Sequence, residues 1–314
     1  ALPILKHYSV LLQESIDNLA IRSDGIYVDG TLGRGGHSAE ILARIPQGHL
    51  YAFDRDASAI EESRERLARI GSNVTLIHSN FSNVKSELEA RGVTGIDGMV
   101  LDLGVSSPQF DEAQRGFSYR FDAPLDMRMD QSQQLSAYQV VNEWEYQELV
   151  RIFFQFGEES FAKQIARKIE KARETKPIET TLELVDVIKS ALPAKVLNKK
   201  GHPAKKVFQA IRIAVNDELG ELQMVLRDAL ALLHVGGRLC VISFQSLEDR
   251  IVKDTFVACS KPKQYDKRLP ILPQDMEEAP YRLVNKKTIT ATEDELRENM
   301  RSHSAKLRCI ERIR

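Results

Sequence analysis

The chain has 314 residues, of which 42% are hydrophobic and 28% charged, and its formal net charge is −1. This is the composition of a folded globular protein with one large or two ordinary domains, and it excludes the fibrous and disordered classes. Its apolar runs are too short to cross a bilayer, so we expect no membrane association. The three cysteines form no CxxC pair, which argues against a disulfide framework and favours a reducing, cytoplasmic location.

The first predicted element is a buried strand that ends at Asp29, breaks into a glycine-rich turn and opens a helix at about 38–45. The turn contains Gly30, Gly33, Gly35 and Gly36. Glycines let the backbone approach a ligand closely and adopt positive φ angles, and free N–H groups at a helix start favour a carboxylate or phosphate. The acid at the strand end suits a ligand that also carries an amine. This combination describes the methionine half of S-adenosylmethionine.

Other nucleotide motifs fit this turn less well. The dinucleotide fingerprint Gly-x-Gly-x-x-Gly is not met, because Gly33-Arg34-Gly35-Gly36-His37 is followed by Ser38, and no phosphate-binding P-loop occurs. A nicotinamide dehydrogenase therefore ranks last among the enzymes considered. A purely structural turn without a ligand is the remaining alternative.

Strands and helices then alternate along the chain as far as residue 103. The predicted strands are 48–53, 73–78 and 98–103, with helices at 57–70 and 84–91. Continuous apolar strands interleaved with helices indicate a mostly parallel sheet covered on both faces, with ligands at the carboxyl ends of the strands. The sequence thus predicts a Rossmann-like α/β fold.

Two residues after these strands are candidates for binding adenosine. Asp54 ends the second strand 19 residues after Gly35, where an acid can accept hydrogen bonds from both ribose hydroxyls. The alternative is that Asp54 caps the following helix, but Asp56 is better placed for that role. Phe81 follows the third strand, and it either flanks the adenine or belongs to the core.

The fourth strand runs into Asp102 and the segment Ser107-Pro108-Gln109-Phe110. This segment resembles a degenerate form of the (Asp/Asn/Ser)-Pro-Pro-(Tyr/Phe) turn of amino-methyltransferases. An aromatic amine is a poor nucleophile, so acceptors aimed at its N–H groups help to localise its lone pair while a sulfonium supplies an activated methyl group. We therefore expect Ser107 and Pro108 to hold the reacting amine. A Ser-Pro turn that merely ends a strand is the alternative.

The alternation stops after the fourth strand. A loop at 106–134 precedes helices that we expect at 137–141, 146–156, 161–173 and 181–192, a linker at 195–206, a helix at 207–233 and a strand at 238–244. The sheet thus resumes after a long helical detour. We predict one domain from residues 1–112 and 207–314, with a helical domain at 113–206 inserted in it.

Positive charge is concentrated in two stretches. Residues 160–206 hold 12 basic and 5 acidic side chains, and residues 296–314 hold 6 basic and 2 acidic ones. Such runs form either a nucleic-acid footprint or solvated helix faces. In the loop before them, Arg115 and Arg128 contact either phosphate or the neighbouring acids Asp126 and Asp130. Histidine, cysteine and acidic residues share no metal-site spacing, so no metal is expected.

Seven motifs occur along the chain in a characteristic order. They are Asp-Gly-Thr-x-Gly-Arg-Gly-Gly-His-Ser, Asp-Leu-Gly-Val-Ser-Ser-Pro-Gln, Pro-Leu-Asp-Met-Arg-Met-Asp, Phe-Gly-Glu-Glu, His-Pro-Ala, Phe-Gln-Ala-Ile-Arg-Ile and Ser-Phe-x-Ser-Leu-Glu-Asp-Arg. From His7 to the C-terminus, the chain resembles the bacterial ribosomal RNA small-subunit methyltransferase H family. The resemblance implies a class I S-adenosylmethionine-dependent enzyme that methylates N4 of a cytidine in 16S rRNA at the decoding centre.

The resemblance also implies a set of site residues and partners. The cofactor contacts are Gly35, Gly36, His37, Asp54, Phe81, Asp102 and Gln109, and Gly33 joins them from the turn. The family usually has His in Ser-Phe-His-Ser-Leu-Glu-Asp-Arg where this chain has Gln245. The implied partner is 16S rRNA or the small ribosomal subunit, and the oligomeric state stays open, with a homodimer as one option. The alternatives are a methyltransferase for a small molecule or protein amine, and an RNA-binding module without turnover.

Overall fold

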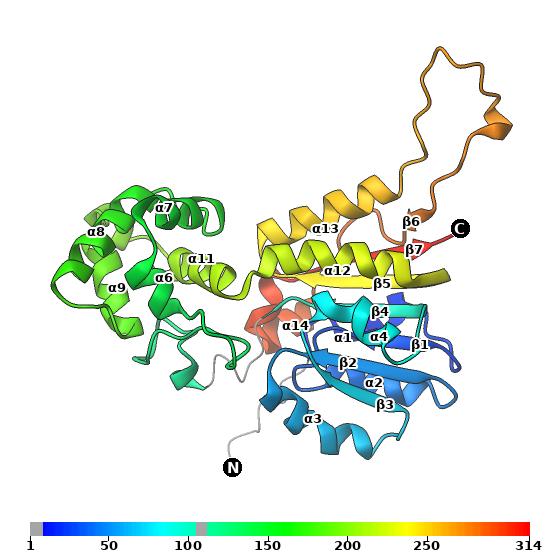
Figure 1. The fold of residues 1–314 in the computed structure, drawn as a ribbon, viewed down its shortest axis with the longest axis horizontal. Coiled ribbons are helices and arrows are strands. Elements are labelled where there is room, and N and C mark those ends of the chain that lie inside the picture. Colours follow the sequence, from blue (N-terminus) through cyan, green and yellow to red (C-terminus); the bar gives the residue numbers. More distant parts are fainter. Residues whose placement is uncertain (1–8, 105–111) are drawn as a thin grey trace. The chain divides into compact units, whose positions relative to one another are not determined.

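The structure, a computed structural model, describes residues 9–104 and 112–314. The chain divides into two units, Ala1–Gly104 with Glu221–Arg314 and Val105–Gly220, which we call the sheet unit and the helical unit (Figure 1). No helix in the described part of the chain is both long and apolar enough to cross a membrane.

The sheet unit contains a seven-stranded sheet in the order β3-β2-β1-β4-β5-β7-β6. The strands are β1 (Ile26–Asp29), β2 (His49–Asp54), β3 (Val74–His78), β4 (Ile96–Asp102), β5 (Leu233–Ser243), β6 (Tyr281–Leu283) and β7 (Lys306–Arg312). The first five strands pair in parallel, and β7 runs antiparallel to both β5 and β6. The predicted mostly parallel, Rossmann-like α/β fold is confirmed.

Helices cover both faces of this sheet (Figure 1). They are α1 (Leu12–Leu19), α2 (Gly36–Arg44), α3 (Ala57–Ala68), α4 (Val84–Glu89), α12 (Glu218–Leu232) and α13 (Ser246–Cys259), whereas the short α14 (Glu293–Glu298) of the same unit buries none of its side chains. Alternate side chains of β4 serve the two faces: Val100 packs with α1, α2 and α3, while Met99 and Leu101 pack with α4, α12 and α13. Both faces are buried, which explains why the central strands read as continuous apolar runs.

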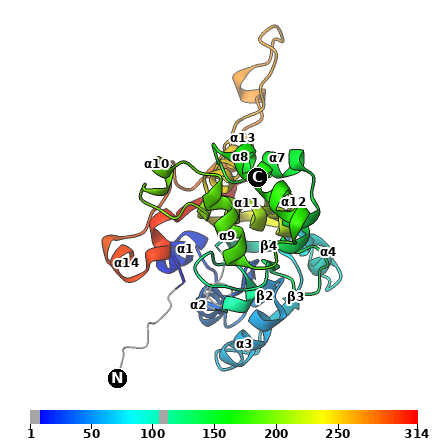
Figure 2. The ribbon, with the colours of Figure 1, turned by 90° about the vertical axis from the view of Figure 1, so that its left-hand side faces the viewer.

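The helical unit has its own apolar core, and its helices are seen in Figure 2. They are α6 (Ala137–Glu143), α7 (Tyr146–Gln155), α8 (Ala162–Thr175), α9 (Thr181–Ser190), α10 (Ala194–Leu197) and α11 (Lys205–Asn216). The four predicted helices after residue 136 are confirmed, and Thr180 caps α9 by accepting a hydrogen bond from Glu183 N–H at 3.3 Å. The short α10 lies in the segment predicted to be a linker.

The single helix predicted at 207–233 is wrong, because the chain breaks at Asp217 into α11 and α12. Asp217 has φ +47°, a left-handed conformation that aspartate tolerates, so no glycine or proline marks the break. Phe208 and Ile211 before the break pack in the helical core, whereas Leu222 after it packs in the sheet core. Helix α11 thus lies on the helical side of the division, while the sequence placed the boundary at 206/207.

Strand β5 starts at Leu233, five residues before the strand predicted at 238–244. The segment His234–Gly237 therefore belongs to the strand, although Gly236 has a left-handed φ of +87°. Its pairing with β4 shifts register between Ile96 and Gly98. Such an irregularity accommodates extra residues in one strand, so a glycine pair here marks a break in the ladder.

Candidate active site

Three carboxylates end three neighbouring strands of the sheet. Asp29 is the last residue of β1, Asp54 of β2 and Asp102 of β4, and β1 lies between the other two strands. All three strands are parallel, so their carboxyl ends meet at one edge of the sheet. Open α/β sheets bind their ligands at this edge.

The glycine-rich turn after β1 has the backbone that its sequence predicted. Gly33 and Gly35 have φ angles of +52° and +81°, and α2 starts at Gly36. The carbonyl of Gly33 accepts a hydrogen bond from Ser63 Oγ at 2.9 Å, which ties the turn to α3. A Cβ on Gly36 would lie 1.8 Å from Ser9 Oγ. Backbone conformation thus favours glycine at positions 33 and 35, and lack of space favours it at position 36.

Asp29 holds the turn together from inside. It is fully buried and accepts hydrogen bonds from Thr31 N–H at 3.0 Å and from Ser38 Oγ at 2.6 Å. Burial raises the pKa of Asp29, and the neighbouring His37 opposes this shift. Asp29 therefore organises the turn from a position that solvent does not reach.

His37 is the one imidazole in this turn, and it is 4% exposed. Burial lowers the pKa of His37 and favours its neutral form, although Asp29 and the backbone of Val10 act in the opposite direction. Its Nε2 atom is buried without a hydrogen-bond partner among the residues that the structure describes. An unpartnered buried nitrogen beside the glycines suits a polar group of a ligand.

Asp54 presents its carboxylate on the far side of the same turn. Its Oδ2 accepts a hydrogen bond from Gly33 N–H at 2.8 Å, and its Oδ1 accepts one from Asp56 N–H at 2.9 Å. Burial raises the pKa of Asp54 to about 6. The helix cap is provided by Asp56, which accepts from Ser58 N–H at 3.0 Å, as predicted. Asp54 is therefore not needed as a cap and keeps acceptor capacity for a ligand.

Asp102 is connected directly to the turn. Its backbone N–H donates to Thr31 Oγ1 at 2.7 Å, and its Oδ1 accepts from Gly104 N–H at 3.1 Å. Burial raises the pKa of Asp102 to about 6, while the charge of Arg301 lowers it. Neither Thr31 nor Arg301 is among the residues that the sequence predicts for this site. Thr31 stands within the glycine motif, whereas only the fold brings residue 301 near residue 102.

Phe81 begins a short 3-10 helix, Phe81–Asn83, after β3. It is half-buried and packs against the sheet core, and its Cβ would lie 3.3 Å from a Cβ placed on Gly30. Phe81 therefore belongs partly to the core and lies beside the end of β1, and its contact with adenine stays a prediction. The predicted residues Ser107, Pro108 and Gln109 lie outside the described residues.

Arg115 and Arg128, in the loop before α6, are held inside the helical unit. Arg128 forms an ion pair with Asp126, with Nε 2.6 Å from Oδ1. The buried side chain of Arg115 donates to the carbonyls of Arg128 and Met129 at 3.0 and 3.3 Å. The ion-pair interpretation of Arg128 is confirmed, and both arginines serve to shape the loop.

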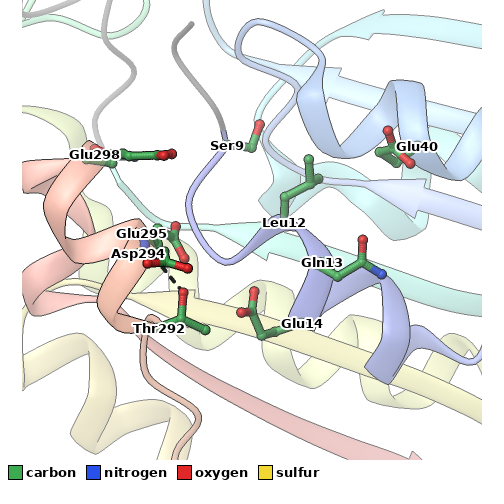
Figure 3. A pocket seen from close by; sticks show the side chains of 10 residues that line it. Ser9, Leu12, Gln13, Glu14, Glu40, Thr292, Asp294, Glu295 and Glu298 are labelled. Carbon is green, nitrogen blue, oxygen red and sulfur yellow. Dashed lines mark hydrogen bonds between the residues drawn. The ribbon is translucent and has the colours of Figure 1, made fainter.

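A cavity of about 340 Å³ lies elsewhere in the sheet unit, beside α1, α2 and α14 (Figure 3). Its lining is Ser9, Leu12, Gln13, Glu14, Glu40, Thr292, Asp294, Glu295, Glu298 and Asn299. Glu295 is occupied in part, since its Oε1 accepts from Leu11 N–H at 2.8 Å. The acidic lining disfavours phosphate groups, so this cavity is a poor candidate for binding a nucleotide or RNA.

Known proteins match the chain over nearly its whole length. The sequence model of the MraW methylase family matches residues 4–313. A protein named "Ribosomal RNA small subunit methyltransferase H" from Limosilactobacillus fermentum is 58% identical over 98% of both chains. A protein of the same name from Exiguobacterium sibiricum is 58% identical over 99% of both.

Likeness to solved structures is weaker. The structure of an rRNA methylase from Streptococcus thermophilus covers 98% of this chain and 99% of its own at 14% identity, with a TM-score of 0.43. The family match and the two relatives confirm the resemblance inferred from the motifs. The chain belongs to the MraW methylase family.

Proposed function

We propose that this chain transfers a methyl group from S-adenosylmethionine to the N4 amine of a cytidine in bacterial 16S rRNA, at the decoding centre. The observation that carries the proposal is the arrangement of Asp54 and Asp102 on either side of the glycine-rich turn, at the carboxyl ends of β2 and β4. Membership of a methylase family and the names of two close relatives support the reaction and the rRNA substrate.

The cofactor of a methylase with this fold is S-adenosylmethionine, and the residues present fit it. Asp54 would accept the ribose hydroxyls, since each of its oxygens uses one acceptor site on a backbone N–H and has another left. Gly33, Gly35 and Gly36, with His37, would approach the methionine part, and Phe81 would flank the adenine. Asp102 and Gln109 would hold the methionine end near the reacting centre.

Bound S-adenosylmethionine supplies a methyl group already activated by a positively charged sulfur. The cytidine enters unstacked, because its amine cannot reach a buried site from within a base stack. Ser107 and Pro108 would orient the amine through hydrogen-bond acceptors, which favours localisation of the nitrogen lone pair. A strong base is unnecessary, since the amine becomes acidic once its bond to carbon forms and then releases a proton.

The helical unit offers positive charge for the RNA backbone. Several lysines of the stretch 160–206 form no ion pair among the described residues: Lys163, Lys168, Lys171, Lys189, Lys195, Lys199, Lys200 and Lys205. Cations of the C-terminal strand are engaged instead, since Arg308 binds Asp249 at 2.8 Å and Arg312 donates to the Leu233 carbonyl at 2.6 Å. The helical stretch is therefore the better candidate for phosphate contacts, and salt should weaken RNA binding steeply.

One experiment tests the reaction. The protein and methyl-labelled S-adenosylmethionine are incubated in three parallel reactions. The substrate is small ribosomal subunits in the first, naked 16S rRNA in the second and a protein fraction free of RNA in the third. We expect label in RNA, at a cytidine whose modified nucleoside co-migrates with N4-methylcytidine. Label on another nucleoside or only in the protein fraction, or binding of RNA without transfer to any substrate, would overturn the proposal.

A further inference from the structure

The His-Pro-Ala motif places His202 against an aromatic ring from a distant loop. The imidazole of His202 stacks on the ring of Tyr119, with centroids 4.2 Å apart and planes inclined by 30°. Tyr119 in turn meets the ring of Phe208 edge-on at 5.8 Å. Phe208 belongs to the core of the helical unit, so the stacked pair is a fixed part of this unit.

Two exposed cations, Arg120 and Lys189, belong to the same unit as this stacked pair. The guanidinium of Arg120 lies 5.8 Å from the centroid of the Tyr119 ring. Burial lowers the pKa of His202, and the charges of Lys189 and Arg120 lower it further. Like charges held close together at a surface create a site for an anion.

The positive charge is not neutralised by acids of the same unit. Neither Arg120 nor Lys189 forms an ion pair with another described residue. Asp122 is turned to the start of α9, where its Oδ1 lies 3.4 Å from Leu182 N–H. Asp186 stands one turn before Lys189 on α9 and does not pair with it. The two cations are therefore available to a ligand.

An exposed aromatic side chain completes the surface. Phe121 is 56% exposed, although its backbone is held firmly. Its carbonyl accepts a hydrogen bond from Thr181 Oγ1 at 2.6 Å, and Thr181 Oγ1 in turn accepts one from Ala123 N–H at 3.0 Å. Phe121 thus exposes a large ring next in sequence to the free cation Arg120, and exposed rings together with cations are features by which proteins bind single-stranded nucleic acid.

We propose that Tyr119, Arg120, Phe121, Lys189 and His202, the Tyr119 patch, bind a single-stranded segment of the rRNA substrate. A base stacks on Phe121, and phosphates lie against Arg120 and Lys189. The inference rests on the proposed function, because it assumes an RNA substrate, and it narrows the broad basic stretch to one defined surface. Planar guanidinium and ammonium groups both suit phosphate oxygens.

The test compares two double variants of the full-length protein. Arg120→Ala with Lys189→Ala removes the patch cations, and Lys163→Ala with Lys171→Ala removes the same charge from α8. Binding of a fluorescent single-stranded oligocytidine of about 12 nucleotides is measured by anisotropy at fixed salt. We expect the patch variant to bind about 30-fold more weakly and the α8 variant less than about threefold, because charge-assisted contacts exceed long-range attraction.

A further variant, Phe121→Leu, probes the stacking contact while retaining an apolar side chain. We expect it to bind the oligonucleotide about fivefold to tenfold more weakly, with a salt dependence equal to that of the wild type. Calorimetric binding of S-adenosylmethionine to all variants reports whether the sheet unit is intact, and far-ultraviolet circular dichroism reports the helical unit.

The outcomes separate this inference from the proposed function. Equal RNA affinity of the patch and α8 variants would overturn the inference, even if the wild type methylates rRNA. The inference would also be overturned if the patch variant bound RNA as the wild type does and lost affinity for a protein instead. A wild type that transfers no methyl group to RNA but loses RNA affinity in the patch variant would support the inference and refute the proposed reaction.

Discussion

Carboxylates at the two sides of the central sheet differ in what surrounds them. On the β5-β7-β6 side, Asp249 receives two hydrogen bonds from Arg308 at 2.8 and 3.1 Å, and Glu311 lies between Arg238 and Arg282. On the β2-β1-β4 side, Asp54 and Asp102 accept hydrogen bonds from backbone N–H groups. The first side uses ion pairs to join elements, whereas the second side leaves acceptor capacity open.

The pKa shifts follow this difference. Arginine partners lower the pKa of Asp249 and of Glu311 against the effect of burial. Burial raises the pKa of Asp54 and of Asp102 to about 6 in both cases. A buried carboxylate that the fold does not compensate costs stability, and such groups cluster where a ligand provides the missing partners. The sign of the pKa shift thus distinguishes the ion-paired acids Asp249 and Glu311 from Asp54 and Asp102.

The largest expected effect is on the ion-paired side. Arg308→Ala should lower the free energy of unfolding by about 3 kcal/mol, because it removes both short ion-pair contacts of the buried Asp249 and leaves it only Lys306 at 3.9 Å and Ser243 Oγ at 3.4 Å. Arg282→Ala is the control, since its side chain is 51% exposed and its loss should cost less than about 1 kcal/mol. Urea unfolding measures both values. Equal losses for the two variants would show that burial does not set the value of these ion pairs.

The next largest effect is expected on the β2-β1-β4 side of the sheet, where Asp54 and Asp102 keep acceptor capacity for a ligand. Asp54→Asn should weaken S-adenosylmethionine binding about 30-fold, because hydrogen bonds from ribose hydroxyls to a carboxylate are stronger than those to an amide. The free energy of unfolding should fall by about 1 kcal/mol, because an amide NH2 group replaces one of the two oxygens that accept from Gly33 and Asp56 N–H. Asp56→Asn is a matched control, because asparagine also caps helices and the affinity should stay within about threefold. Unchanged calorimetric affinity of the Asp54 variant would exclude Asp54 from the site.

Stability and cofactor affinity should respond to pH in opposite directions. The pKa values of Asp54 and Asp102 are raised from 3.8 to about 6, so the folded state takes up protons first as the pH falls from 7 to 5. The free protein should become more stable over this range, by on the order of 1 kcal/mol, while S-adenosylmethionine binding weakens as the acceptors are protonated. Below pH 4, protonation of Asp249 and Glu311 should reverse the gain.

Thermal unfolding and calorimetry between pH 4 and 8 measure the two trends. Asp54→Asn should remove about half of the stability change between pH 7 and 5, because one of the two titrating groups is gone. A free protein whose stability does not rise on acidification to pH 5 would contradict the assignment of raised pKa values to these carboxylates.

The sequence was sufficient for the first four strands of the sheet and for most of the turn, because both depend on local patterns. Apolar runs alternating with helical periodicity located β1 to β4, and glycines at Gly33 and Gly35 marked two positive φ angles. The same local reasoning distinguished Asp56 as the helix cap from Asp54 as a candidate ligand. Motifs in family order then identified the MraW methylase family.

Features that depend on long-range packing could not be predicted in this way. Asp217 adopts a left-handed conformation that leaves no glycine signal, so α11 and α12 were read as one helix. The approach of Arg301 to Asp102 joins residues almost two hundred positions apart. The sequence also does not tell the two basic stretches apart, because only the fold shows that Arg308, in the C-terminal stretch, is ion-paired.

Gln245 stands after β5, between the two sides of the sheet, and should produce the smallest effect. Its backbone N–H donates to Glu248 Oε1 at 3.2 Å at the start of α13, a bond that any side chain permits, and its own Oε1 is buried without a hydrogen-bond partner in the described part of the chain. Gln245→His, which restores the residue usual in the family, should therefore leave S-adenosylmethionine affinity and methyl transfer within about twofold and stability within about 0.5 kcal/mol. Methyl transfer that rises tenfold, with a new dependence on pH near 6.5, would instead show that an imidazole here takes part in the reaction. That result would place a titrating group at the end of β5, the neighbour of β4. The side of the sheet with open acceptor capacity would then include β5 as well.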